Sequence, residues 1–432
     1  MASAAAVSCP ALLIAGCASG QGKTTVTAAL ARYHARMGRR VKVFKTGPDF
    51  IDPTILEAAS GAPVYNIDCW MIGTEDSRAL LAAAAQEADL ILVDGAMGLH
   101  DGEPSAADLA ATFDLPVAAV IDAGAMAQTF GAVAKGLKEY RTVPFAGIIA
   151  NRVASAGHSR MLAASLPPDI ALLAALPKAA RSFPERHLGL VQADELAGLT
   201  VMLDALADLV GASGYTALPP AVKFAPCDAP AAPQLLAGRC IAVARDAAFS
   251  FLYRANIDCL TAMGAELIFF SPVADEAVPA ADALYLPGGY PELHAAQLAR
   301  NRRWLDSTRA FAAAGRPLLA ECGGMMVLFD TLATLDGTAH AMAGLLPGKV
   351  TMRERLAALG LQSVGLPQGE LRGHSFHYSQ LDTPLDPVWR CRPRCQGTGE
   401  YVYRRGLITA SYLHAYFPSN PVAVAALLTG TA

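Results

Sequence analysis

The chain has 432 residues, of which 53% are apolar, and this length predicts about two or three domains. Its net charge of −4 argues against a nucleic-acid-binding surface, and no apolar run reaches the ~20 residues that span a bilayer. The nine scattered cysteines predict reduced thiols and a cytoplasmic protein. The N-terminus is small and apolar without a charged region, so we expect no signal peptide.

The first glycine-rich stretch, residues 16–25, follows an apolar run at 11–15 and precedes a helical pattern at 26–37. A strand, a glycine-rich turn and a Lys-Thr helix start together predict a phosphate-binding loop. The first glycine lies one residue earlier than the common G-x4-G-K-[ST] spacing requires, so the loop is a variant. The candidate ATP-binding residues are Gly20, Gln21, Gly22, Lys23, Thr24 and Thr25.

Acidic residues follow two further predicted strands, at 41–45 and 88–93. Ligands of open α/β sheets bind beyond the carboxyl ends of the strands, so these acids and Lys45 are expected near the phosphate loop. Turn-forming aspartates are the alternative reading. The candidates for contacts with ATP or substrate are Lys45, Asp49 and Asp101, and those for Mg²⁺ are Thr24, Asp49 and Asp94.

Strand and helix patterns alternate along both halves of the chain. Residues 117–121, 145–150, 240–244, 267–270 and 283–286 are read as strands, and 75–87, 127–140, 193–210 and 248–263 as helices. This alternation predicts an α/β fold with two doubly wound domains. We expect a nucleotide-binding domain at 1–211, an Ala/Pro-rich linker at 212–238 and a second α/β domain at 239–432.

Cys322 lies in a sharp turn between a strand at 318–321 and a helix that we expect to begin at Met325. This is the layout of a nucleophile elbow, in which we expect the helix N-terminus to lower the thiol pKa. His414, after an apolar run at 407–413, is the candidate base. Gly289 and Gly323 are the candidate oxyanion-hole donors. Tyr416 stands where an orienting acid is common, so either another group orients His414 or a dyad suffices.

Several motifs together resemble a known family. The loop at 16–24 resembles the dethiobiotin synthetase type, and PGGYPE at 287–292, AECGGMM at 320–326 and His414 resemble class I glutamine amidotransferases. With GPDFIDP at 47–53, MGLHDG at 97–102, PERHLGL at 184–190 and GHSFHYS at 373–379, nearly the whole chain resembles the cobyrinic or hydrogenobyrinic acid a,c-diamide synthases.

The resemblance implies a ligase of cobalamin biosynthesis that uses ATP with Mg²⁺, glutamine and a corrin ring acid, with no nucleic-acid or membrane partner. Acyl-phosphate formation in the first domain and glutamine hydrolysis at Cys322 and His414 would together amidate the c and a acetate groups. A homodimer is a possible assembly. Two positions depart from the family pattern, since Phe50 replaces a common Tyr and Asp94 replaces a common Glu. His100, in MGLHDG, is more similar to the branch of the family that uses a metal-free ring.

Three other functions fit the sequence less well. A cobyric acid synthase, which amidates other side chains of the ring, is disfavoured by GPDFIDP and PERHLGL. A partition-type ATPase would carry a lysine where this chain has Cys17, and would leave the thiol elbow unexplained. A binding module with a degenerate amidotransferase domain conflicts with the presence of both Cys322 and His414.

Overall fold

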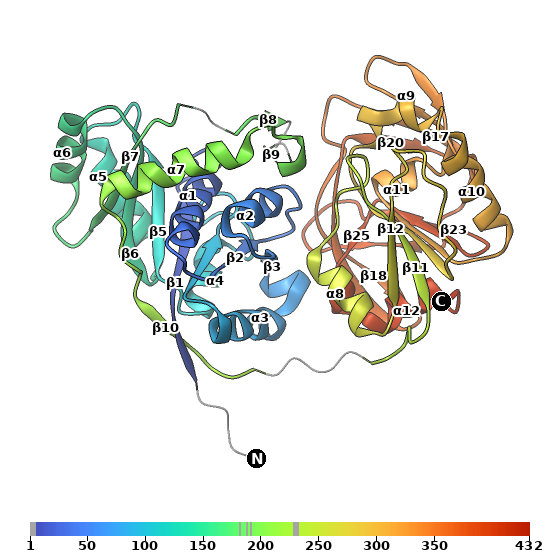
Figure 1. Cartoon of the computed structure of the whole chain (residues 1–432), viewed down its shortest axis with the longest axis horizontal. Coiled ribbons are helices and arrows are strands. Elements are labelled where there is room, and N and C mark those ends of the chain that lie inside the picture. The colour runs from blue at the N-terminus through green and yellow to red at the C-terminus, as the bar shows by residue number, and fades with distance from the viewer. Residues whose placement is uncertain (1–5, 181–182, 187–188, 191, 228–232) are drawn as a thin grey trace. The chain divides into compact units, whose positions relative to one another are not determined.

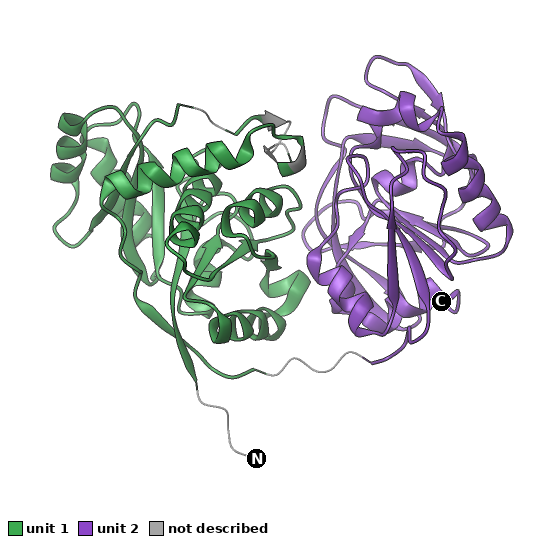
Figure 2. Cartoon of the chain, viewed as in Figure 1, with its two compact units in different colours: residues 1–229 green, residues 230–432 purple. Residues whose placement is uncertain are grey.

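The structure, a computed structural model, describes residues 6–180, 183–186, 189–190, 192–227 and 233–432. His187 and Leu188 of the PERHLGL motif lie outside the described residues. The chain divides into two compact units, Met1–Ala229 and Pro230–Ala432 (Figure 2). Within the part of the chain that the structure describes, no helix combines the length and apolar character needed to cross a membrane.

A parallel sheet forms the centre of the first unit, with the strand order β3-β2-β4-β1-β5-β6-β7 (Figure 1). Helices connect the strands, as parallel neighbours require. The strands are β1 (Val7–Gly16), β2 (Val41–Thr46), β3 (Tyr65–Ile67), β4 (Leu90–Asp94), β5 (Val117–Asp122), β6 (Phe145–Val153) and β7 (Leu172–Pro177). The helices are α1 (Lys23–Arg36), α2 (Asp52–Ser60), α3 (Thr74–Glu87), α4 (Ala106–Thr112), α5 (Thr129–Glu139), α6 (Ala156–Ser165) and α7 (Leu199–Ser213).

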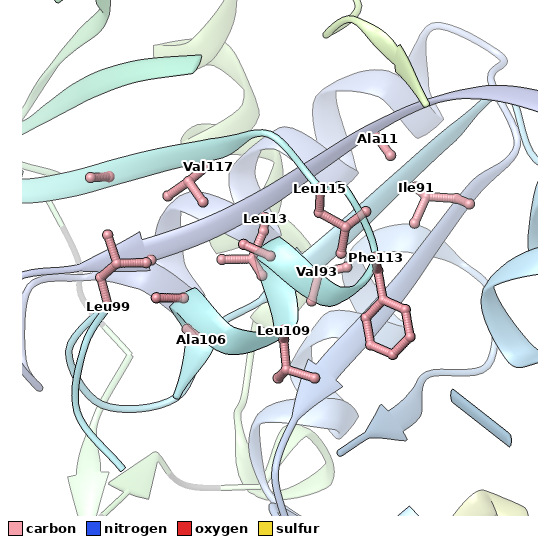
Figure 3. Close-up of a cluster of buried hydrophobic side chains, with 14 of the residues drawn as sticks. Ala11, Leu13, Ile91, Val93, Leu99, Ala106, Leu109, Phe113, Leu115 and Val117 are labelled. Carbon is pink, nitrogen blue, oxygen red and sulfur yellow. The ribbon is translucent and has the colours of Figure 1, made fainter. Parts of the chain in front are cut away.

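Two apolar cores cover the two faces of this sheet, because successive residues of a strand point to opposite sides. Leu13 of β1 packs in one core with residues of α3, α4 and α5, part of which Figure 3 shows. Its neighbours Leu12 and Ile14 pack in the other core with α1, α2 and α7. Burial on both faces explains why these strands are continuous apolar runs, and the predicted doubly wound α/β fold is confirmed.

The second unit contains a sheet with the order β12-β11-β13-β14-β24-β23-β21, whose first five strands are parallel. These strands are β11 (Cys240–Ala244), β12 (Glu266–Phe270), β13 (Ala283–Leu286), β14 (Leu318–Glu321), β21 (Trp389–Arg390), β23 (Tyr401–Arg405) and β24 (Ile408–Ser411). The helices are α8 (Arg254–Ala262), α9 (Ala295–Leu298), α10 (Arg302–Ala313), α11 (Gly323–Met326) and α12 (Pro421–Thr429).

Two smaller sheets extend the second unit, with the orders β16-β15-β17-β20 and β22-β18-β19-β25. The strand β25 carries His414 and pairs with β19, so that residues 373 and 374 lie opposite 415 and 414. The strands of these sheets are β15 (Phe329–Ala333), β16 (Ala339–Ala341), β17 (Leu346–Met352), β18 (Ala358–Leu366), β19 (Gly369–His377), β20 (Ser379–Asp382), β22 (Arg392–Pro393) and β25 (His414–Ala415).

Three segments differ from the sequence-based expectation. The helix after Cys322 covers only Gly323–Met326, and the chain enters β15 at Phe329. The apolar run at 407–413 is divided between β24 and the following segment, which leads to β25 in another sheet. Residues 221–224, within the expected linker, form β10 (Ala221–Phe224), which pairs antiparallel with β1. Val222 and Phe224 are buried there while their neighbours Ala221 and Lys223 are exposed, because successive side chains of a strand point to opposite faces.

Candidate nucleotide and glutaminase sites

The loop between β1 and α1 is built for close backbone approach. Gly20 and Gly22 adopt positive φ values of 77° and 87°, which favour glycine. A methyl group added at Gly22 would lie 2.3 Å from Asn151 Nδ2, so a side chain there would displace Asn151. Lys23 opens α1 and donates from Nζ to the Ala18 carbonyl at 2.9 Å, which folds its side chain back over the loop.

Gln21 fastens this loop to the ends of two neighbouring strands. Its carbonyl accepts a hydrogen bond from Asn151 Nδ2 at 3.0 Å, and its side-chain oxygen accepts from the Asp122 amide at 2.9 Å. Thr25 is half-buried in the first turn of α1. The six loop residues predicted for ATP therefore lie together at the carboxyl end of β1, and Asn151 is an additional support that the sequence analysis did not single out.

A charged cluster adjoins the loop, made of Thr24, Lys45, Asp52 and Asp94. Lys45 Nζ donates to Asp52 Oδ2 at 2.7 Å and to Asp94 Oδ2 at 2.8 Å. Thr24 Oγ1 lies 2.9 and 3.0 Å from the same two oxygens. The second oxygen of Asp94 accepts from Thr27 Oγ1 at 2.8 Å. The residues come from the ends of β2 and β4 and the starts of α1 and α2. This agrees with the expectation that ligands of open α/β sheets bind beyond the carboxyl ends of the strands.

The charges of this cluster stabilise one another. Burial alone would lower the pKa of Lys45, but the Asp52 and Asp94 carboxylates outweigh burial and raise it. Burial alone would raise the pKa of Asp52, and the Lys45 ammonium reverses this so that the net shift is downward. Burial, followed by the charge of Lys45, lowers the pKa of Lys23. Both carboxylates of the cluster thus face a buried cation.

Asp49 borders this cluster through Lys45 and Asp52. Its Oδ1 accepts from the amides of Ile51 and Asp52 at 2.8 and 3.1 Å, while Oδ2 stays 4.0 Å from Lys45 Nζ. Burial and then the neighbouring Asp52 carboxylate raise the pKa of Asp49. Asp101 is exposed and accepts from the Gly98 amide at 3.1 Å. Asp52, from the same GPDFIDP motif, is the acid that contacts both Thr24 and Lys45.

Cys322 forms the predicted elbow in the second unit. It directly follows β14 and adopts a φ of 45°, a conformation that non-glycine residues rarely adopt. Its amide donates to the Ser411 carbonyl at 2.7 Å. A methyl group at Gly324 would lie 2.1 Å from the Leu286 carbonyl oxygen, so the bend requires a small residue there. The prediction that the helix lowers the thiol pKa is wrong here: α11 is only four residues long, and burial raises the pKa of Cys322.

The Gly288–Gly289 turn lies against both His414 and the elbow. A methyl group at Gly288 would lie 2.3 Å from His414 Cε1, and one at Gly323 would lie 3.0 Å from the Gly289 nitrogen. The two glycines predicted to form an oxyanion hole are therefore neighbours in space. Burial, followed by the nearby His374, lowers the pKa of His414, so its ring is neutral.

The GHSFHYS strand, β19, borders this site, which the sequence analysis did not anticipate. His374 stacks on His414 with ring centroids 5.0 Å apart, and its Nδ1 contacts the Tyr253 hydroxyl at 2.9 Å. Burial lowers the pKa of His374 to about 3. His377 Nε2 lies 3.0 Å from Glu400 Oε1, and the Phe376 carbonyl lies 3.9 Å from the Cys322 sulfur. The close spacing of His374 and His377 in one short motif was the sequence signal that could have indicated this part of the site.

Family models match both halves of the chain. Residues 12–188 match the CobQ/CobB/MinD/ParA nucleotide binding domain, and residues 240–422 match the CobB/CobQ-like glutamine amidotransferase domain. The fold and the two sites thus define a glutamine amidotransferase with its own nucleotide-binding domain.

Relatives of similar length indicate the family to which the chain belongs within this class. A hydrogenobyrinate a,c-diamide synthase of Stutzerimonas stutzeri (strain A1501) is 59% identical, covering 97% of this chain and 98% of the relative. One of Pseudomonas aeruginosa (strain PAO1) is 58% identical, covering 97% of each. A cobyrinate a,c-diamide synthase of Herminiimonas arsenicoxydans is 54% identical, covering 97% and 96%. The chain belongs to the family of hydrogenobyrinate and cobyrinate a,c-diamide synthases, which confirms the resemblance inferred from its motifs.

Proposed function

We propose that this protein uses ATP and glutamine to amidate the a and c acetate carboxylates of hydrogenobyrinic or cobyrinic acid. The observation that carries the proposal is the 59% identity, across nearly the entire chain, to a relative named hydrogenobyrinate a,c-diamide synthase. The coexistence of a phosphate loop and a thiol elbow in one chain supports it, because amide formation needs both an activated acid and a nitrogen source.

The first unit would activate the acid. A carboxylate is a poor electrophile, so a ring carboxylate oxygen attacks the γ-phosphorus of ATP, the bond to ADP breaks, and an acyl phosphate forms. Gly20, Gln21, Gly22, Lys23, Thr24 and Thr25 would hold the phosphates. Lys45 would offer its charge to the transferred phosphoryl group, with Asp49 and Asp101 as further contacts to ATP or substrate.

The oxygen atoms of Thr24, Asp52 and Asp94 fit Mg²⁺. They are hard donors, and their meeting point already holds a cationic ammonium, that of Lys45. Among the described residues, no set of three or more His, Cys, Asp or Glu forms a metal cage, which suits an ion that keeps waters and binds phosphate oxygens through one or two carboxylates. The bound ion would neutralise charge on the β- and γ-phosphate oxygens. We propose Asp52 rather than Asp49 as the second carboxylate ligand.

The second unit would release the nitrogen. Cys322 Sγ attacks the side-chain carbonyl carbon of glutamine, and His414 takes the thiol proton. The oxyanion would be met by the amides of Gly289 and Gly323. The C–N bond then breaks, His414 returns the proton to the departing nitrogen as ammonia, and water hydrolyses the thioester to glutamate. The ammonia nitrogen attacks the acyl phosphate, phosphate leaves, and a proton is lost.

A single assay tests this proposal. Purified protein is incubated with ATP, Mg²⁺, glutamine and either the cobalt-containing or the metal-free ring acid, and the product mass is recorded. We expect two amide additions on at least one ring, with two ATP consumed. Four additions would instead indicate an amidotransferase of the cobyric acid synthase type. Glutamine hydrolysis that never couples to ATP consumption on either ring acid would refute the proposal.

The Lys23→Ala variant tests the phosphate-loop assignment in the same assay. We expect synthesis to fall about 10³-fold with either glutamine or ammonia, because the loss of one positioned charge at the phosphates costs that order. Unchanged synthesis would contradict the assignment. A cytoplasmic location and a homodimer remain predictions, and sedimentation of the purified protein tests the second.

A further inference from the structure

A buried acid with no part in the proposed chemistry directly precedes the nucleophile. Glu321 ends β14, and only 3% of its surface is exposed. Acidic side chains are almost never fully buried unless they are paired, because burial without partners is costly. The partners of this carboxyl therefore indicate what it does.

Both oxygens of Glu321 have partners on other elements. Oε1 accepts a hydrogen bond from the Ala415 amide at 3.2 Å, and Oε2 accepts from the Tyr285 hydroxyl at 2.8 Å. Ala415 directly follows His414. One side chain thus joins the backbone that carries the thiol to the backbone that carries the imidazole.

The short strand β25 depends on such support. It consists of His414 and Ala415, and among the described strands it pairs only with β19. Asn256 of α8 donates from Nδ2 to the Ala415 carbonyl at 2.8 Å and accepts from the Phe417 amide at 2.8 Å. Both main-chain polar groups of Ala415 are therefore held by side chains, with Glu321 providing the contact from the elbow.

We propose that Glu321 is a positioning residue that fixes the strand of His414 relative to Cys322. Because its bond reaches the main chain rather than the ring, it offers a different solution from an acid placed on the imidazole. The inference rests on the proposed hydrolysis of glutamine by Cys322 and His414.

The need for this contact follows from the elbow itself. The backbone of Cys322 is strained, and such conformations persist only where the surroundings over-determine them. The amide of Cys322 is already bound to Ser411, on β24. The bond from Glu321, the residue before Cys322, to the Ala415 amide likewise holds the elbow against β25, which follows β24 along the chain. A displacement of about 1 Å between reacting groups costs about 10²-fold in rate.

Glu321→Leu removes both acceptors at similar volume. We expect kcat for glutamine hydrolysis to fall about 10²-fold while KM for glutamine and ammonia-dependent synthesis change less than threefold. Glu321→Gln keeps an acceptor for the Ala415 amide and a polar partner for Tyr285, so its kcat should stay within about threefold of wild type. Tyr285→Phe is the matched control, because it leaves the bond from Glu321 to the Ala415 amide in place and removes only the hydroxyl, which interacts with Glu321 and Asn256. Its kcat should fall less than about fivefold.

Three results would overturn the inference: equal kcat losses in Glu321→Leu and Tyr285→Phe, a kcat loss in Glu321→Gln as large as that in Glu321→Leu, or a rise in KM that accounts for the loss. If Glu321→Leu fails to fold, Glu321→Asp decides, since its acceptor is retracted by one methylene; undiminished kcat in that variant would refute the role. Failure of the proposed glutamine hydrolysis is distinguishable, because wild-type protein would then release no glutamate from glutamine. Failure of ring amidation alone would leave the glutaminase kcat measurable in every variant.

Discussion

The two candidate sites solve the burial of reactive groups in opposite ways. In the first unit, buried charges face one another, since the Lys45 ammonium lies between the Asp52 and Asp94 carboxylates. In the second, burial keeps the reactive groups neutral, because it raises the pKa of Cys322 and lowers that of His414. A site that meets charged phosphates can be prepared with charges in advance. A site that hydrolyses an uncharged amide needs charge only during the reaction, when a proton moves from sulfur to nitrogen.

The largest expected effect separates the two sites. Cys322→Ala should reduce glutamine-dependent synthesis by about 10⁴-fold or more, because the nucleophile is lost. Ammonia-dependent synthesis should remain, since acyl-phosphate formation does not use the thiol. Both rates are measured from product mass with each nitrogen source. Loss of both rates in a protein with an unchanged circular dichroism spectrum would show that the sites are not separable.

The next test removes the buried cation of the first site. Lys45→Met should lower synthesis from either nitrogen source about 10³-fold and lower the free energy of unfolding by about 3–5 kcal/mol, since Asp52 and Asp94 would face no counter-charge. Lys42→Met is the control on the same strand, where the ammonium pairs with an exposed Glu87 carboxylate at 3.1 Å. Its effect should stay below about 1 kcal/mol. Similar losses in both variants would contradict a special role for the buried cluster.

A smaller effect is expected from crowding the imidazole. Gly288→Ala places a methyl group against His414 Cε1, and we expect the glutaminase rate to fall about 10²-fold as the ring moves. Gly365→Ala in β18 is the control, because no atom lies within 4 Å of the added methyl. Steady-state glutamate release measures both variants. An unaltered rate in Gly288→Ala would mean that the ring has room to shift without loss.

The last test concerns the pH dependence of stability. Burial raises the pKa of Glu321 to about 8, whereas an unfolded Glu titrates near about 4.3. The native state therefore binds the extra proton between these values, so the stability from this group is complete below about pH 4 and is lost as the pH rises towards 8. Glu321→Gln should flatten this part of the profile. Thermal unfolding of both proteins across this range checks it, and parallel profiles would exclude the shift.

Local patterns were enough to predict the framework of both sites. A continuous apolar run, a glycine-rich turn and a helix start are adjacent in sequence, and so are the strand and turn around Cys322. The choice between Asp49 and Asp52 was not predictable in this way. In GPDFIDP one acid accepts the amides at the start of α2 while the other faces Lys45, and only the direction of the chain as it enters the helix distinguishes them.

Contacts between distant strands were also beyond the sequence. His374 lies opposite His414, although 40 residues separate them, because β25 leaves the main sheet and pairs with β19. The pairing of two short strands leaves no periodic signal. The direction of the Cys322 pKa shift was missed for a related reason, since an elbow pattern shows neither the length of the following helix nor the depth of burial.

The pairing of β10 with β1 has a practical consequence for expressing the first unit alone. Residues 221–224 pair with residues 7–10, which form the first part of β1. The rest of β1, residues 11–16, pairs with β4 and β5. A fragment truncated at residue 211 would present this first part as a bare edge that invites intermolecular strand addition. A fragment that runs through Phe224 keeps the edge covered, and solubility should favour it over the shorter one.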